Sequence, residues 1–118
     1  MEIFRFDRKE KRIGRYGSVG ARATRIAAGT GEVNLTWLTV EPGGVIGTHP
    51  ATGSQLFLVV AGDGWVAGPD GERVAICAGS GVRWDAGEEH ACGTTAGLTA
   101  LAIEGTPLGL FEPEPSDA

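Results

Sequence analysis

Hydrophobic residues along the chain fall in short runs separated by Gly, Pro and Asp, without the spacing of an amphipathic helix. The runs are rich in Val, Ile, Leu, Thr and Trp, which is typical of β-strands. Evenly spaced short strands without helices predict an all-β sandwich or barrel. We expect strands near residues 3–6, 21–27, 33–41, 45–49, 55–61, 64–67, 73–77, 82–85, 89–94 and 98–104.

Glycine and proline mark the turns between these strands. Residues that favour turns end four of the apolar runs, at Pro42-Gly43-Gly44, Pro69-Asp70-Gly71, Ala86-Gly87 and Ala96-Gly97. The dipeptide Asp63-Gly64 lies between two further runs. It predicts a two-residue hairpin, because both residues tolerate a positive φ.

The predicted strand at residues 55–61 is apolar on both of its faces, since every residue from Leu56 to Ala61 is hydrophobic. A strand with one solvated face would alternate with polar residues. Both faces must therefore be covered, either by a second layer of the barrel or by another subunit. Of the two, we expect the second, which predicts a homodimer.

Charge is distributed unevenly along the 118 residues, which have the length of one domain. Residues 1–25 carry a net charge of +5, and the remainder carries −10. Apolar residues are interleaved with the basic ones, so we expect the segment to pack on an acidic surface of its own subunit or a partner's, rather than bind nucleic acid. We divide the chain into N-terminal strands and arm (1–30), barrel (31–106) and an acidic, flexible tail (107–118).

The N-terminal sequence lacks the apolar core of a secretory signal, and the longest uncharged stretch, from Pro42 to Gly62, is broken by glycines. These features predict a cytoplasmic protein without a membrane partner. In that compartment Cys77 and Cys92 are expected to be reduced.

The chain has two histidines, His49 and His90, and a hairpin through residues 52–54 would place Gln55 on the same face as His49. Cys92 and Thr94 share the strand parity of His90. Polar groups that converge inside an apolar barrel need a partner, a ligand, water or a metal.

The spacing of these residues resembles the first motif of the cupin family. That motif is Gly, five residues, His-any-His, three or four residues, Glu, six residues, Gly. Gly43, His49 and Gly62 match it. Ala51 stands in place of the second histidine, and Gln55 stands in place of the glutamate.

The second cupin motif is Gly, five residues, Pro-any-Gly, two residues, His, three residues, Asn. Gly79, Gly87 and His90 match it, whereas Asp85 replaces the proline and Thr94 replaces the asparagine. The resemblance implies a cupin-like double-stranded β-helix, also called a jelly-roll barrel.

Cupin metal sites usually bind iron, manganese, nickel, copper or zinc through three His and one Glu. The resemblance therefore implies a site of His49, Gln55 and His90 that binds a divalent transition metal weakly, because Ala51 cannot ligate and an amide is a poorer donor than a carboxylate. Some cupin isomerases do use a glutamine ligand. Gln55 would otherwise form a hydrogen bond across the barrel. Cys92 is either a thiolate ligand or a small buried hydrophobe.

The aromatic and polar residues near these positions are candidates for the wall of a small-molecule pocket: Phe57, Trp84, Thr94 and Trp37. Three functions stay open. The first is a metal-dependent enzyme of the oxygenase or isomerase type, and the second is a metal-free protein that binds a small molecule. The third is a catalytically inactive dimeric scaffold.

Overall fold

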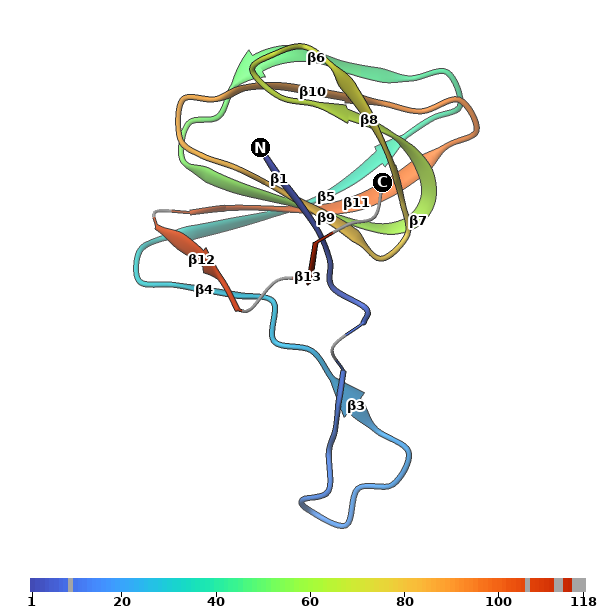
Figure 1. Cartoon of the computed structure of the whole chain (residues 1–118), viewed down its shortest axis with the longest axis vertical. Coiled ribbons are helices and arrows are strands. Elements are labelled where there is room, and N and C mark those ends of the chain that lie inside the picture. The colour runs from blue at the N-terminus through green and yellow to red at the C-terminus, as the bar shows by residue number, and fades with distance from the viewer. Residues whose placement is uncertain (9, 106, 112–113, 116–118) are drawn as a thin grey trace.

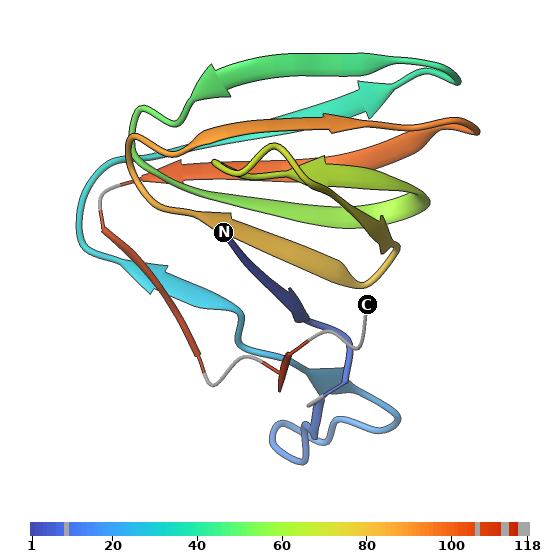
Figure 2. The same cartoon turned by 45° about the horizontal axis from the view of Figure 1, so that its top comes forward.

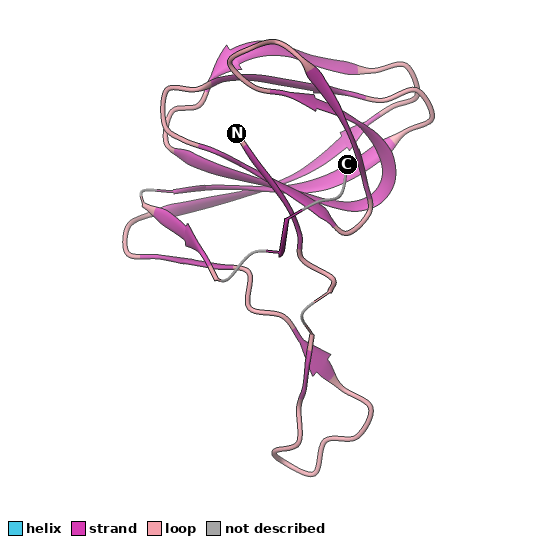
Figure 3. Ribbon diagram, viewed as in Figure 1, coloured by secondary structure: helices cyan, strands magenta, loops and turns pink. Residues whose placement is uncertain are grey.

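A computed structural model describes residues 1–8, 10–105, 107–111 and 114–115. These residues are built from strands and loops (Figure 3), which confirms the all-β prediction. The strands are β1 (Glu2–Arg5), β2 (Lys11–Arg12), β3 (Arg22–Ala23), β4 (Ala27–Gly29), β5 (Val33–Val40), β6 (Val45–Pro50), β7 (Ser54–Ala67), β8 (Arg73–Cys77), β9 (Ser80–Trp84), β10 (Glu89–Gly93), β11 (Leu98–Gly105), β12 (Leu108–Leu110) and β13 (Glu114–Pro115).

The barrel consists of two layers that share the long strand β7 (Figures 1 and 2). The first half of β7 pairs with β9 and β11, and through them with β1, β13 and β5. The second half pairs with β8 and β10, and β10 pairs with β6. Because β7 runs from one layer into the other, it closes the barrel along one side.

The predicted hairpin at Asp63-Gly64 is wrong, because β7 continues through it and joins the expected strands 55–61 and 64–67. Gly62 has φ +78° where the strand changes layer, and the β7–β11 register shifts beside Thr99. A side chain at Gly62 would collide with the carbonyl of Gly97, so the glycine allows a bulged bend. The dipeptide therefore lies in a bend rather than a reversal.

The other expected turns are present. Gly44 N–H donates to the carbonyl of Glu41 at 2.7 Å, and Gly71 N–H donates to the carbonyl of Gly68 at 2.9 Å. Gly87 has a positive φ of 86° in the turn before β10. Two of these turns lead into the strands that carry the histidines, the turn at Gly44 into β6 and the turn at Gly87 into β10.

Both faces of β7 are buried from Leu56 to Val59, as predicted from its sequence, whereas Val60 and Ala61 are exposed. Phe57 and Val59 point into the core between the two layers. Leu56 and Leu58 belong to a second apolar cluster, which Leu108 joins from β12. The cover on this outer face therefore comes from β4 and β12 of the same chain, so the expectation that another subunit covers it is wrong for Leu56 and Leu58.

Leu108 is buried, so the flexible tail cannot start at residue 107 as expected. β12 pairs with β4, and β13 pairs with β1, which holds this part of the chain against the barrel. The expectation of flexibility for residues 112–113 and 116–118 concerns positions outside the described residues.

Residues 10–25, called the arm from here on, project away from the barrel at the end opposite β6 (Figure 1). The expected strand at 21–27 is divided into β3 and β4, with β3 paired only to the two residues of β2 among the described strands. The basic segment was expected to pack on its own subunit or on a partner's. The first alternative is excluded for the tip of the arm, since Tyr16 is 90% exposed, and the second stays a prediction. In the part of the chain that is described, no helix has the length and apolarity to cross a membrane.

Candidate functional site

The two histidines lie side by side on neighbouring strands. His49 on β6 and His90 on β10 are direct cross-strand partners, and their ring centroids are 4.2 Å apart. Cross-strand partners in an antiparallel pair project from the same face of the sheet. The sequence expectation that the histidines face one another is thus met by the register of these two strands.

Each imidazole is oriented by a backbone carbonyl two residues earlier in the chain. His49 Nδ1 lies 2.7 Å from the carbonyl oxygen of Gly47, and His90 Nδ1 lies 3.1 Å from that of Glu88. A carbonyl can only accept, so each neutral ring carries its proton on Nδ1 in this arrangement. Nε2 is then the nitrogen with a free lone pair, which is the form in which histidine binds metals.

One face of the His90 ring packs on a buried aromatic stack. The indole of Trp84 is stacked on the His90 ring with centroids 4.4 Å apart, and Phe57 meets Trp84 edge-on at 5.9 Å. Trp84 is 1% exposed and His90 is 4% exposed. His49 is exposed to solvent. In this pair, His90 is therefore held in the core, whereas His49 is accessible.

Burial shifts the titration of both candidate donors on β10. The pKa of His90 is lowered, mainly because burial disfavours the imidazolium and further because His49 is close. His90 is therefore neutral at pH 7 and ready to donate its lone pair. Burial raises the pKa of the Cys92 thiol, so Cys92 is protonated at neutral pH and is a poor ligand by itself.

Gln55 enters the same region from β7. It is the register partner of Trp84 on one side and of Glu104 on the other. Glu104 is near enough to oppose the lowering of the His90 pKa. Sequence reasoning missed Glu104, although its even position in the strand places it on the same face as Ala100 and Ala102.

A cavity of about 200 Å³ lies among these side chains. It is lined by the expected metal ligands His49, Gln55, His90 and Cys92 and by the expected wall residues Phe57 and Trp84. The lining residues that sequence reasoning missed are small or aliphatic: Thr36, Leu38, Ile46, Ala91 and Ala102. Strand alternation through Val40 and Ala100 is the signal that would have identified Thr36, Leu38 and Ala102.

Two expected wall residues lie elsewhere. Thr94 Oγ1 donates to the carbonyl of Asp63 at 2.7 Å and accepts from Gly97 N–H at 2.9 Å, so it stabilises the turn between β10 and β11. Trp37 is 65% exposed on the outer face of β5, because odd positions of this strand point away from the cavity. Neither residue can contact a molecule in this cavity.

The residues present fit a metal only in part. Within the described ranges, no group of three or more His, Cys, Asp or Glu is placed to hold an ion. Ala51 is buried and bonded through its backbone to the turn before β10, and it does not line the cavity. Two imidazole nitrogens and the Gln55 carbonyl are the donors that remain, and they form a neutral site.

Comparison with known proteins agrees with this fold. A profile of the Cupin_2 family, described as a cupin domain, matches residues 36–103. This match covers more than half of the chain, which therefore belongs to the cupin family. No curated protein sequence matches the chain significantly.

Solved structures show the same double-stranded β-helix. A cupin superfamily protein from Desulfitobacterium hafniense is 15% identical, with 86% of this chain and 95% of that chain covered and a TM-score of 0.59. A predicted oxalate decarboxylase from Thermotoga maritima is 25% identical, with a TM-score of 0.54 and 65% of each chain covered. The salicylate 1,2-dioxygenase of Pseudoaminobacter salicylatoxidans is 15% identical, with 68% of this chain and 24% of that chain covered and a TM-score of 0.59. The chain spans only 65% of the length of the first two structures matched, one of them the Thermotoga protein.

Proposed function

We propose that this cupin binds a divalent transition metal weakly through His49, Gln55 and His90, together with a small organic molecule in the adjoining cavity. The observation that carries the proposal is the pair of imidazoles with centroids 4.2 Å apart. Each ring is held at Nδ1 by a backbone carbonyl, so both Nε2 atoms are left to bind.

The expected affinity is low because the site lacks an anionic ligand. Zinc, nickel, iron, manganese and copper all accept imidazole nitrogen, and the Gln55 carbonyl would complete a three-donor set. Cys92 would join only after losing its proton, which burial opposes. Glu104 on the neighbouring strand supplies negative potential that favours a cation.

The second part of the proposal, the organic ligand, is supported by Trp84. Its Nε1 is buried, and in the described part of the chain it has no hydrogen-bond partner. An unsatisfied buried donor costs about 1–3 kcal/mol, which a ligand with an acceptor oxygen would recover. The cavity of about 200 Å³ limits this ligand to a small molecule.

A bound metal would act as a Lewis acid that polarises an oxygen of the ligand. Of the chain's own residues, His49 and His90 would hold the metal through Nε2, His90 stays neutral on its Trp84 support, and the Gln55 amide N–H can donate a hydrogen bond that orients the ligand. The oxygenase and decarboxylase named above share the fold with this chain, and their activities are candidates to assay.

The test is elemental analysis of protein purified without a polyhistidine tag and without added metal. We expect partial occupancy by a transition metal, filled on incubation with zinc, nickel or iron. His49→Ala should abolish binding, and it should leave thermal stability unchanged because His49 is exposed. His49→Asn is a second test of the ring, because its side chain can still donate to the Gly47 carbonyl but has no imidazole, and it too should lose the metal.

The alternative is a metal-free cupin that binds the small molecule alone, which the incomplete donor set favours. It predicts no metal uptake by the wild-type chain, together with a rise in melting temperature on addition of small organic acids that Trp84→Phe removes. A chain that responds to neither metal nor ligand would support the third candidate, an inactive scaffold.

A further inference from the structure

Large exposed hydrophobic side chains gather on two surfaces of this chain. The first is the tip of the arm, where Tyr16 is 90% exposed and Val19 is 94% exposed. The second, called the outer β5 face from here on, consists of Val33, Leu35 and Trp37. Contiguous apolar surface of this kind marks a contact with another molecule.

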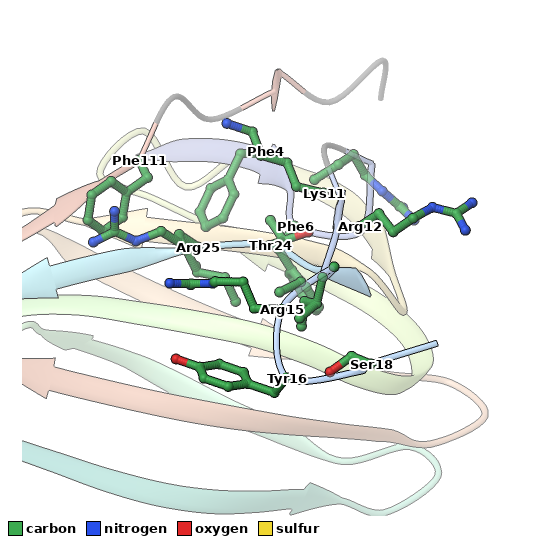
Figure 4. A pocket seen from close by; sticks show the side chains of 15 residues that line it. Phe4, Phe6, Lys11, Arg12, Arg15, Tyr16, Ser18, Thr24, Arg25 and Phe111 are labelled. Carbon is green, nitrogen blue, oxygen red and sulfur yellow. The ribbon is translucent and has the colours of Figure 1, made fainter. Parts of the chain in front are cut away.

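The arm does not lie on its own barrel. Its short β2–β3 ladder is too small to be stable alone in water. A groove of about 960 Å³ separates it from the barrel (Figure 4), with Arg15 and Tyr16 on the arm side and Phe4 and Phe111 on the barrel side. The arm therefore presents an open, partly apolar concave surface that its own chain leaves unfilled.

The outer β5 face is the uncovered end of an otherwise buried layer. Leu58, Leu101 and Trp37 are register neighbours across β7, β11 and β5, and their exposure rises along this row from 5% for Leu58 to 65% for Trp37. In the next row Leu56 is fully buried, whereas Leu35 is 63% exposed. The cover from β4 and β12 stops before β5, which pairs only with β11 among the described strands.

Charge makes the two surfaces complementary. The arm carries five Lys or Arg and one acid, a net charge of +4, and within the described residues none of these five bases has an ion-pair partner. The segment between Arg25 and Arg73, which contains β5, has no Lys or Arg. Exposed Glu32 and Glu41 flank β5 at its two ends.

We propose that two copies of this chain associate by placing the arm of each on the outer β5 face of the other. The exchange is mutual, so the pair closes on itself and needs no third copy. The tip and groove of the arm would cover Leu35 and Trp37, while the arm's bases approach Glu32 and Glu41. This surface lies on the face of β5 opposite to Thr36 and Leu38, which line the histidine cavity.

The experiment measures the mass of the full chain by light scattering as a function of protein concentration. We expect twice the chain mass of 12.2 kDa at micromolar concentration. Leu35→Asp and the double variant Arg12→Glu/Arg15→Glu should each weaken association at least tenfold. Val45→Asp is the matched control: Val45 is 60% exposed on β6, and the variant should associate like the wild type.

Tyr16→Asn separates the contribution of the ring from that of the turn. Tyr16 and Gly17 have φ of 61° and 68°, and asparagine tolerates this left-handed conformation better than tyrosine. The variant should keep the turn and still dissociate at least tenfold more readily. Association should also weaken as salt rises from about 0.05 M to about 0.5 M.

Hydrogen exchange on the dimer then locates the contact. Amides of residues 14–19 and 33–38 should lose protection together on dilution and in Leu35→Asp. A monomer at every concentration would overturn the proposal, and the arm would then need an acidic partner of another kind. A dimer in which only one of the two segments is protected would overturn the arm-to-β5 contact.

Discussion

In both the histidine cavity and the arm, a nitrogen-containing side chain packs against an aromatic ring. The two regions differ in what holds that aromatic ring in place. In the cavity, His90 is stacked on Trp84 at 4.4 Å, inside the core between two sheets. In the arm, the Arg15 guanidinium lies 5.6 Å from the ring of Tyr16, which stands in solvent. The cavity is thus organised by the barrel itself, whereas the aromatic ring at the tip of the arm has no such support from the barrel.

Replacing the supporting ring in each region gives the largest expected difference. Trp84→Ala removes a side chain that is 1% exposed and leaves a cavity beneath His90 and Phe57. We expect a loss of about 3–5 kcal/mol in the free energy of unfolding, measured by urea denaturation. Metal uptake at His90 should fall with it.

Tyr16→Ala is the corresponding change in the arm. At concentrations where the chain is monomeric, it should alter the free energy of unfolding by less than about 0.5 kcal/mol, because the ring is solvated. Similar losses for Trp84→Ala and Tyr16→Ala would contradict the contrast between a preformed cavity and an arm without a partner.

The two regions also differ in how far the sequence could predict them. The positions of His49, Gln55 and His90 follow from strand alternation and the cupin spacing, and all three line one cavity. The bend at Gly62 could not be predicted, since Asp63-Gly64 is equally compatible with a hairpin and with a bulged strand that changes layer.

Residues outside the motifs were harder to place for a related reason. Trp37 and Thr94 were assigned to the cavity wall by residue type, but strand parity turns Trp37 outward and a local turn uses the Thr94 hydroxyl. The basic segment is a different case: its apolar residues indicate packing, but the sequence does not say whether they pack on the same chain or on a partner. The exposed tip excludes the same chain there, and a partner stays a prediction. The alternation of residues along a strand determines which face of the sheet a residue occupies. Which surface packs against that face is decided by tertiary contacts, which the local sequence does not contain.

Gln55→Glu tests whether the cavity is a metal site weakened by one missing charge. A carboxylate at this position would give a cation an anionic ligand, and we expect the metal dissociation constant to fall about tenfold, or about 1.4 kcal/mol. Without metal, the new charge faces Glu104 directly across the strand pair, which should cost about 0.2–1 kcal/mol of stability. Calorimetric titration and urea denaturation measure the two effects.

Gln55→Leu is the matched variant, with similar size and no oxygen. It should bind metal more weakly than the wild type if the amide carbonyl is a ligand. Equal affinity for the wild type and Gln55→Leu would show that Gln55 only packs against the cavity, and that any metal is held by the two histidines.

Asp7→Asn tests the connection between β1 and the arm, and only a small effect is expected. Arg5 at the end of β1 donates to both Asp7 oxygens, through Nε at 3.0 Å and through Nη2 at 2.6 Å. The hydrogen bonds from Arg5 lower the pKa of Asp7, although partial burial opposes this. Because the folded pKa is depressed, the stabilisation is present above the ordinary aspartate pKa of about 4 and is lost as the pH falls through the lowered value.

The Asp7 side chain is 41% exposed, so screening by water should keep this contribution below about 1 kcal/mol. Urea denaturation of the wild type and Asp7→Asn at neutral pH should show that small difference, and it should shrink as the pH falls through the lowered pKa of Asp7 in the folded protein. A stability difference that persists in acid would mean that Asp7 acts through packing between β1 and the arm rather than through its charge. In that case the arm would be more rigidly coupled to the barrel than its exposed tip indicates.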